Sequence, residues 1–203
     1  ATCVEITRRG DPARSPAAWD HLAQVLGRYG APWVVQLWTK DVRGTLALGR
    51  SLVARVHDGG TTVTAQVTVT GLAGSVWEPG VPQDVVSHLG DLADALGGPE
   101  HIAWRYDPII PTVHTAERFA RLAREVAKQG VRRGVINFVA APGRYRRVDR
   151  RLAPLLEGWS TGMPGYDAAW REAIARQVTA IASSEGISLA CCAESSALAG
   201  RVP

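Results

Sequence analysis

Residues 101–139 read HIAWRYDPIIPTVHTAERFARLAREVAKQGVRRGVINFV, and this stretch decides the fold class. The runs His101–Arg105 and Gly134–Val139 are rich in β-branched and aromatic residues, which is typical of β-strands. Between them, Ala116–Gln129 repeats apolar residues at intervals of three and four, as one face of an amphipathic helix does. Gly130 follows directly and predicts the end of that helix. The stretch therefore predicts a strand–helix–strand unit.

The same alternation extends over the rest of the chain. We predict six strands, at Cys3–Thr7, Trp33–Trp38, Val63–Val69, His101–Arg105, Gly134–Val139 and Ile187–Cys192. Besides Ala116–Gln129, helical spacing of apolar residues occurs in Ala17–Tyr29, Gln83–Leu96 and Ala168–Ser184. Glycine and proline interrupt the pattern twice, which predicts a Gly-Gly turn at Asp58–Thr62 and an irregular excursion over the mouth at Pro142–Tyr166.

Alternating strands and helices predict parallel strands joined by right-handed crossovers. This leaves two architectures, a doubly wound open sheet and a full or partial barrel. No glycine-rich phosphate turn follows the first strand, whereas polar residues follow nearly every strand. We therefore favour an α/β fold with a partial (β/α) TIM-like barrel of about six parallel strands and outer helices. The length of 203 residues fits a single domain over residues 1–203.

The composition is that of an ordinary globular protein, with 46% hydrophobic and 21% charged residues. No stretch approaches the roughly 20 apolar residues that cross a bilayer, so we expect no membrane span. The first residues lack the pattern of a secretory signal, and the cytoplasm is the expected location. Cys3, Cys191 and Cys192 are too few and too badly spaced for a disulfide framework. The net charge of +4 comes almost wholly from arginine and is compatible with an anionic ligand.

Charged and hydroxyl side chains concentrate at the carboxyl ends of the predicted strands, which is the end that carries the active site in barrels. Arg105 and Asp107 alternate onto one face at the end of an apolar strand. Because burying either charge alone is costly, we predict that they pair, bind a ligand or face a wet cavity. The predicted catalytic residues are Asp11, Asp107 and Glu194, and the predicted ligand-binding residues are Arg8, Arg9, Thr39, Lys40, Gln66, Thr68, Glu78, Arg105 and Asn137.

Other interpretations of these residues stay open. Arginine–aspartate networks also stabilise barrel mouths without taking part in chemistry. The run Arg144–Arg151 has the character of a solvated helical face more than of a phosphate clamp. The chain has no Cys-x-x-Cys, His-x-His or His-Glu-x-x-His pattern for zinc, no nucleophilic-serine elbow and no phosphate-binding loop. Mg²⁺ or Mn²⁺ would need the fold to bring carboxylates together, the candidates being Asp11, Asp41, Glu78, Asp107 and Glu194.

Six short motifs follow one another along the chain: Arg8-Arg9-Gly10-Asp11-Pro12, Trp38-Thr39-Lys40-Asp41, Gln66-Val67-Thr68-Val69-Thr70-Gly71, Glu78-Pro79-Gly80-Val81-Pro82, Trp104-Arg105-Tyr106-Asp107-Pro108-Ile109 and Cys192-Ala193-Glu194. Together they resemble, over nearly the whole chain, a bacterial family called the domain of unknown function 1848 family. The resemblance implies a barrel-like α/β fold. It also implies, for longer members, C-terminal cysteines similar to the cluster-binding triad of radical S-adenosylmethionine enzymes. A [4Fe–4S] cluster and S-adenosylmethionine are therefore expected only if a cysteine-rich segment follows Pro203.

These observations predict an enzyme that binds an anionic small molecule or nucleotide-like ligand at the barrel mouth. The arginines and Lys40 of the predicted site would hold anionic groups, and its three catalytic carboxylates would move protons. With a cluster-bearing C-terminus the resemblance implies radical chemistry. Without one, the prediction is a cofactor-independent or Mg²⁺-dependent lyase or hydrolase. The alternatives are a non-catalytic module that holds a ligand or a nucleic-acid segment, and a structural remnant whose mouth is only salt-bridged.

Overall fold

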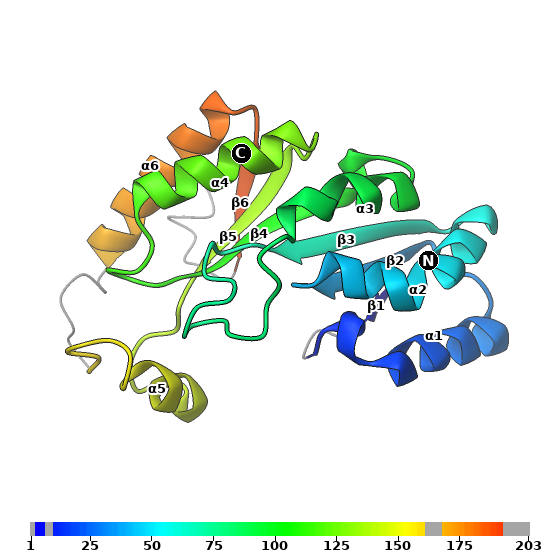
Figure 1. Ribbon diagram of the computed structural model, residues 1–203, viewed down its shortest axis with the longest axis horizontal. Coiled ribbons are helices and arrows are strands. Elements are labelled where there is room, and N and C mark those ends of the chain that lie inside the picture. Colours follow the sequence, from blue (N-terminus) through cyan, green and yellow to red (C-terminus); the bar gives the residue numbers. More distant parts are fainter. Residues whose placement is uncertain (1–2, 7–9, 161–167, 193–203) are drawn as a thin grey trace.

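The computed structural model describes residues 3–6, 10–160 and 168–192. Six strands form one parallel sheet in the order β1-β2-β3-β4-β5-β6, so each strand pairs with its neighbours in sequence (Figure 1). β1 and β6 are the two edges of this open sheet. The strands are β1 Cys3–Ile6, β2 Val34–Thr39, β3 Thr62–Thr68, β4 Ile102–Ile109, β5 Arg133–Phe138 and β6 Ser188–Cys191.

The strand order confirms the α/β fold with a partial, barrel-like sheet. In a doubly wound sheet the order reverses at a switch point, whereas here it runs in one direction with parallel pairing throughout. Right-handed crossovers that all advance in one direction place their helices on the same face of the sheet. The opposite face corresponds to the interior of a closed barrel.

The helices are α1 Pro16–Tyr29, α2 Val42–Asp58, α3 Leu89–Leu96, α4 Ala116–Lys128, α5 Arg146–Leu152 and α6 Ala168–Ser184, with short 3-10 turns η1 Pro12–Arg14, η2 Val86–His88 and η3 Pro99–His101. All four predicted helical segments contain a helix, but in Gln83–Leu96 the α-helix begins only at Leu89, after the 3-10 turn Val86–His88. α2 was not predicted, and it begins after Asp41, whose side chain accepts a hydrogen bond from the Gly44 amide at 2.8 Å. None of the described helices is long and apolar enough to cross a membrane.

The main core lies between the helices and one face of the sheet. Alternate strand residues point into it, including Leu37 of β2, Val67 of β3 and Trp104 of β4. Trp104 stacks on Phe119 of α4 with ring centroids 5.1 Å apart, and its indole nitrogen donates to the Val69 carbonyl at 2.9 Å. This bond lets a large indole be buried without an unpaired donor. The core therefore joins β3, β4 and α4 directly below the ends of the strands.

The opposite face of the sheet, called the polar face below, has a different composition. Its side chains are mostly half-buried and carry amide, hydroxyl and charged groups. Because side chains alternate along a strand, these positions are the ones between the core residues. They hold Gln36, Thr64, Gln66, Thr68, Arg105, Asp107 and Asn137.

A second, smaller apolar cluster lies beyond the carboxyl ends of the strands. Leu72, Ile110 and Val139, which follow β3, β4 and β5, pack there with Leu152 of α5 and with Leu156. α5 belongs to the segment predicted as an irregular excursion, and this cluster ties it to the strand-end loops. The loops around the strand ends are therefore packed against one another.

Candidate functional site

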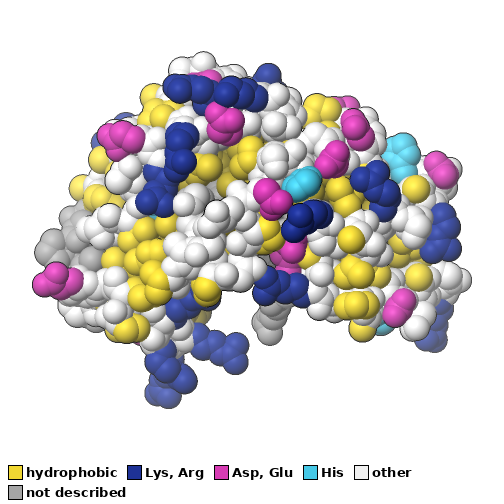
Figure 2. Space-filling view, viewed as in Figure 1, with side chains coloured by type: hydrophobic (Ala, Val, Ile, Leu, Met, Phe, Trp, Pro, Cys, Tyr) yellow, Lys and Arg dark blue, Asp and Glu magenta, His cyan; other side chains and the backbone are white. Residues whose placement is uncertain are grey.

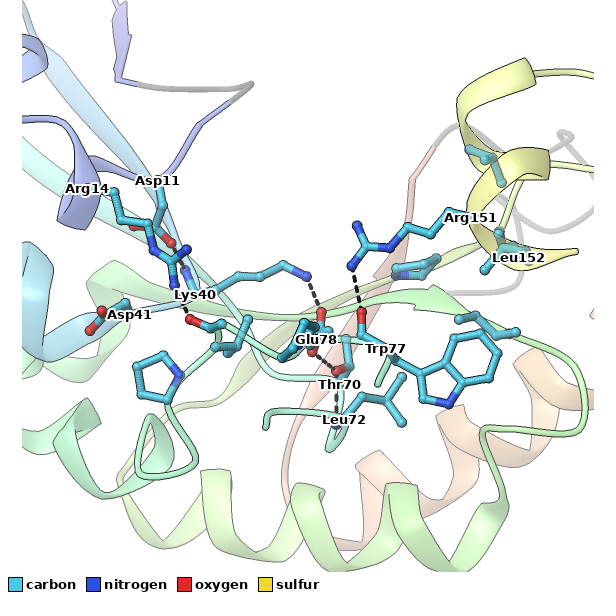
Figure 3. Close-up of a pocket in the computed structure, with 18 residues that line it drawn as sticks. Asp11, Arg14, Lys40, Asp41, Thr70, Leu72, Trp77, Glu78, Arg151 and Leu152 are labelled. Carbon is cyan, nitrogen blue, oxygen red and sulfur yellow. Dashed lines mark hydrogen bonds and ion pairs between the residues drawn. The ribbon is translucent and has the colours of Figure 1, made fainter. Parts of the chain in front are cut away.

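A cavity of about 680 Å³ opens at the carboxyl ends of the strands, between the β3–α3 connection and α5 (Figure 3). Its volume is that of a small-molecule site, which typically measures about 300–1,000 Å³. One part of the wall is apolar and comes from the second cluster, through Leu72, Ile110, Val139 and Leu152. The charged residues of the wall are Asp11, Arg14, Lys40, Asp41, Glu78 and Arg151.

Asp11 joins the segment before α1 to the end of β2. One carboxylate oxygen accepts the Ala13 amide at 3.0 Å and the Thr39 hydroxyl at 2.8 Å, and the other accepts the Lys40 amide at 2.6 Å. Thr39 is buried, and its hydroxyl oxygen also accepts the Asp41 amide at 2.9 Å. These bonds hold the backbone of Lys40 in place, so Asp11 orients the residue that follows β2.

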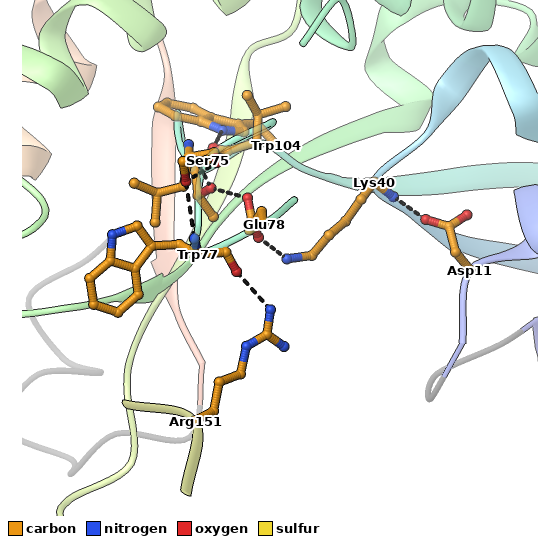
Figure 4. A network of polar contacts seen from close by, with 10 residues as sticks. Asp11, Lys40, Ser75, Trp77, Glu78, Trp104 and Arg151 are labelled. Atoms are coloured by element: carbon orange, nitrogen blue, oxygen red, sulfur yellow. Dashed lines mark hydrogen bonds and ion pairs between the residues drawn. The ribbon is translucent and has the colours of Figure 1, made fainter. Parts of the chain in front are cut away.

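Lys40 and Glu78 form an ion pair at the centre of the cavity wall (Figure 4). The other carboxylate oxygen of Glu78 accepts the Thr70 hydroxyl, which itself accepts the Leu72 amide at 3.2 Å. The side chain of Glu78 is 10% exposed and that of Lys40 is 38% exposed, so the ammonium is the more accessible partner. An ammonium has three N–H donors, and that of Lys40 makes one hydrogen bond within the described part of the chain, which leaves it able to donate to a ligand.

Two arginines stand on opposite sides of the cavity, with Lys40 and Glu78 between them (Figure 3). Arg14 donates to the Gly80 carbonyl, and Arg151 donates to the Trp77 carbonyl at 2.6 Å. Neither guanidinium has an acidic partner among the residues that the structure describes. Because a guanidinium has five donors, both arginines retain donors for an anion. The wall of the cavity therefore carries two guanidinium groups with spare donors, next to the carboxylates of Asp11, Asp41 and Glu78.

A second polar group, the Arg105 cluster, lies on the polar face of the sheet. Arg105 donates to Gln66 at 2.6 Å and to the carboxylate of Asp107, and its guanidinium lies 4.6 Å from the ring centroid of Trp38. The side chain of Arg105 is 7% exposed and that of Asp107 is 20% exposed. A buried charge is tolerated when it is paired and hydrogen-bonded in this way. The cluster consequently holds Arg105 in one orientation.

The rings of Tyr106 and His114 lie on the helix-covered face of the sheet, near the loops that follow the strands. The Nδ1 atom of His114 accepts the Ile110 amide at 2.9 Å, which leaves the proton of the neutral ring on Nε2. Burial and the nearby Arg118 lower the pKa of His114 to about 4. Burial raises the pKa of Tyr106, whose ring lies edge-on to His114 with centroids 5.0 Å apart. At neutral pH both rings are uncharged.

The structure places the predicted site residues in two groups. Asp11, Thr39, Lys40 and Glu78 belong to the network at the cavity, whereas Gln66, Arg105 and Asp107 form the Arg105 cluster, with Thr68 and Asn137 on the same face of neighbouring strands. Arg8, Arg9 and Glu194 lie outside the described residues. The catalytic and binding roles assigned to all these residues stay predictions.

Sequence reasoning missed the apolar wall of the cavity and the arginines beside it. Arg14 and Arg151 lie on short helical elements, whereas the charged residues predicted for the site follow the strands. One signal could have found Arg151. Val148 and Leu152 lie four residues apart within the arginine-rich run, which is the spacing of an apolar helical face that needs a partner. The structure shows that this partner is the second cluster.

The cysteines of this chain do not fit the iron–sulfur cluster that the resemblance implies for longer members. Cys3 is exposed on β1, whereas Cys191 and Cys192 lie at the end of β6, which is the opposite edge of the sheet. A cluster needs several thiolates that converge on one point. Within the described part of the chain, no three His, Cys, Asp or Glu side chains are grouped to hold a metal ion.

Comparison with known proteins agrees with the motifs along the chain. No curated protein matches this sequence. A family model matches residues 14–201, which is nearly the whole chain, and this confirms the resemblance. The matched region includes Thr39, Lys40 and Glu78 of the cavity network and the Arg105 cluster, and it begins after Asp11. The chain therefore belongs to the family described as Domain of unknown function (DUF1848).

Proposed function

We propose that the protein is an enzyme that binds an anionic small molecule in the cavity at the carboxyl ends of the strands. The observation that carries the proposal is the accessible ammonium of Lys40, which lies in the cavity wall between two arginines without acidic partners. A carboxylate or phosphate group bound at Lys40 would receive charge-assisted hydrogen bonds from the ammonium, and a further anionic group of the same ligand would bind Arg14 or Arg151 on either side.

The rest of the wall indicates what the anionic group is attached to. Leu72, Ile110, Val139 and Leu152 form an apolar surface next to the cations, and Trp77 adds an aromatic ring. A ligand that fills both parts therefore carries an anionic group at one end and an apolar or planar body at the other. This description covers a nucleotide-like molecule as well as an organic acid.

Glu78 is the carboxylate that we assign to proton transfer. It lies beside Lys40 in the cavity wall and is largely shielded from solvent, while Thr70 fixes one of its oxygens. A general base must reach the proton that it removes, and a ligand held at Lys40 would lie next to Glu78. Asp11 then acts as a positioning residue, because its bonds hold the backbone of Lys40.

Asp107 is a second acidic group that a larger ligand would contact. It is the more exposed member of its pair with Arg105, and the residue after it, Pro108, lines the cavity. A ligand that extends from the cavity onto the polar face would meet Asp107 before it met the more buried Arg105. No step of the proposal passes through an iron–sulfur cluster.

The proposal is tested by thermal unfolding with inorganic phosphate, pyrophosphate, citrate and adenosine monophosphate as probes. A probe present at a concentration of about 100 times its dissociation constant adds about 2.7 kcal/mol to the free energy of unfolding. This corresponds to a rise in Tm of about 5–10 °C for a domain of this size. We expect Lys40→Met to abolish the shift, because it removes the accessible cation. The matched control is Lys128→Met, since Lys128 is the other lysine of the chain and pairs with Glu125 on the surface of α4.

The outcomes separate the alternatives. If a probe raises the Tm of Lys40→Met as much as that of the parent, the probe does not bind at Lys40 in the cavity. Loss of the shift in both lysine variants would indicate a dependence on net charge and would also count against the cavity. If the protein converts one of the probes, the variant Glu78→Gln should bind that probe with similar affinity. It should convert the probe at least about 100-fold more slowly than the parent. Unchanged turnover would exclude Glu78 as the base, and binding without turnover of any probe would favour a non-catalytic module.

A further inference from the structure

The net charge of the protein is concentrated in one short segment. Residues 144–151 contain five arginines and one aspartate, so this segment alone accounts for the net charge of +4, and positive and negative residues balance in the remainder of the chain. The segment comprises α5 up to Arg151 and the two residues before the helix. In Figure 2, Lys and Arg side chains project from the lower part of the molecule, where Figure 1 places α5.

The arginines of α5 share one side of the helix. Successive residues of a helix are about 100° apart, which puts Arg146, Arg147, Arg150 and Arg151 on one half of its surface and Val148 and Leu152 on the other. Both apolar residues pack into the second cluster. The arginine side consequently faces away from the second cluster, and all four arginines are exposed, with Arg151 at the edge of this side reaching the Trp77 carbonyl.

These arginines are not neutralised by the described part of the protein. Arg146, Arg147 and Arg150 have no hydrogen bond or ion pair there. Asp149 is the acidic residue of the segment, and its carboxylate is already occupied. It accepts the Gly143 amide at 3.2 Å and the Trp159 indole at 3.0 Å, so it stabilises the fold of the segment instead of pairing with an arginine.

From this arrangement we propose that α5 binds the phosphate backbone of a single-stranded nucleic acid. Guanidinium groups bind phosphates through paired donors, and a dense basic surface with an aromatic side chain is the pattern of single-strand binding. Tyr145 supplies the aromatic side chain, since it is 53% exposed and lies beside the guanidinium of Arg144. A base of the strand stacks on Tyr145 while its phosphates contact the arginine side of α5.

A membrane surface fits the same helix less well. An interfacial helix inserts its apolar side between lipids, but the apolar side of α5 is packed in the second cluster. The cavity adds a further argument, because Arg151 lies four residues after Arg147 on the same side of α5 and also lines the cavity. A strand that crosses α5 therefore passes the opening of the cavity. The proposal does not depend on which anion occupies that cavity.

The test measures fluorescence anisotropy of labelled single-stranded DNA and RNA of about 20 nucleotides, between about 50 and 200 mM NaCl. We expect the logarithm of the affinity to fall with the logarithm of the salt concentration with a slope of about −3, from four phosphate contacts at about −0.7 each. In Arg146→Ala/Arg147→Ala/Arg150→Ala the slope should fall to about −1 and the affinity at low salt at least about tenfold. Arg151 is left unchanged because it lines the cavity. The triple variant therefore tests nucleic-acid binding by α5 without changing the residues that would bind an anion in the cavity.

The matched control is Arg50→Ala/Arg55→Ala/Arg121→Ala, which removes the same charge from exposed positions on α2 and α4. It should keep the slope and lose less than about twofold in affinity. Tyr145→Ala should weaken binding by about fivefold without changing the slope, because stacking involves no counterion release. Circular dichroism and the melting temperature establish that each variant is folded.

Three results would overturn the proposal. The first is equal loss of binding in the α5 variant and the control, which would make net charge the cause. The second is equal affinity for a duplex of the same length together with no effect of Tyr145→Ala. The third is binding to vesicles that contain phosphatidylserine, or to polyglutamate, in the absence of binding to the oligonucleotides.

Discussion

Arg105 is a charged side chain within the sheet, and its environment explains how it is accommodated. It donates to Gln66 and Asp107 and lies over the ring of Trp38, so its charge is paired, hydrogen-bonded and stacked. Removing one member of a buried ion pair leaves the other without its partner, which costs more free energy than the intact pair contributes. The pair is therefore a sensitive point for stability, whatever its role toward a ligand.

A double-mutant comparison tests this coupling. We expect Arg105→Met to lower the free energy of unfolding by about 3 kcal/mol, because it leaves the carboxylate of Asp107 unpaired. Adding Asp107→Asn should recover at least half of that loss, as the unpaired charge is then gone. Urea unfolding followed by circular dichroism measures both values. Arg121→Met, on the exposed side of α4, should change the stability by less than about 0.5 kcal/mol. Strictly additive losses in the double variant would show that the two charges do not depend on each other.

At the scale of elements, α1 and α2 approach closely because α2 has a glycine at their contact. A Cβ atom at Gly49 would lie 2.2–2.5 Å from ring atoms of Trp19, which is buried in α1 and donates its indole N–H to the Pro12 carbonyl at 3.0 Å. In an exposed helix glycine costs about 1 kcal/mol relative to alanine. Here the close packing of the indole against the α2 backbone is the compensating gain.

Two glycine-to-alanine substitutions of opposite expected sign follow from this contact. Gly49→Ala should destabilise the protein by about 1–3 kcal/mol despite its better helix propensity, since Trp19 has to move. Gly27→Ala, in α1, should stabilise it by up to about 1 kcal/mol, because no heavy atom lies within 4 Å of the new Cβ. Urea unfolding of both variants provides the comparison. A gain of stability in both would mean that α1 and α2 are less tightly packed than described.

At the scale of the whole molecule, His114 makes the stability depend on pH. Its pKa is lowered to about 4 by burial and by Arg118, whereas the ordinary value of 6.5 applies once the chain is unfolded. Between these two values the unfolded chain binds a proton that the native protein does not. The free energy of unfolding therefore falls as the pH falls from about 6.5 to about 4, by about 3 kcal/mol for this group.

The variant His114→Asn isolates this contribution. Asparagine does not titrate, and its side-chain oxygen can replace Nδ1 as the acceptor for the Ile110 amide. We expect the loss of stability between about pH 7 and about pH 4.5 to be smaller in this variant than in the parent by about 2–3 kcal/mol. Urea unfolding at both pH values measures the difference. An identical pH dependence in His114→Asn and in the parent would contradict the assignment.

Much of this fold could be predicted from local pattern. The strands around Leu37, Val67 and Ile136 alternate buried and half-buried residues, and that alternation is visible in the sequence. α2 escaped prediction because Gly44 and Gly49 have the character of helix breakers. Their place in a helix is explained by their neighbours, since a Cβ at Gly44 would meet Ala13 and Asp41 and one at Gly49 would meet Trp19.

The candidate site was predicted in part for a related reason. The carboxyl ends of parallel strands meet at one edge of a sheet, so the positions of Lys40, Arg105 and Asp107 near that edge followed from the strand assignments. The apolar wall of the cavity did not follow, because Leu72, Val139 and Leu152 belong to loops and to α5. Periodicity does not report how such segments pack.

By itself, the sequence determined the six strands, four of the helices and the end of the sheet at which charged residues gather. These depend on the periodicity of neighbouring residues, which is written directly in the chain. Only the tertiary structure decided that Lys40 pairs with Glu78, 38 residues away, and that Arg151 reaches Trp77, 74 residues away. Alternation tells which side of an element is buried but not which distant segment covers it, and that choice is made by packing the whole chain at once.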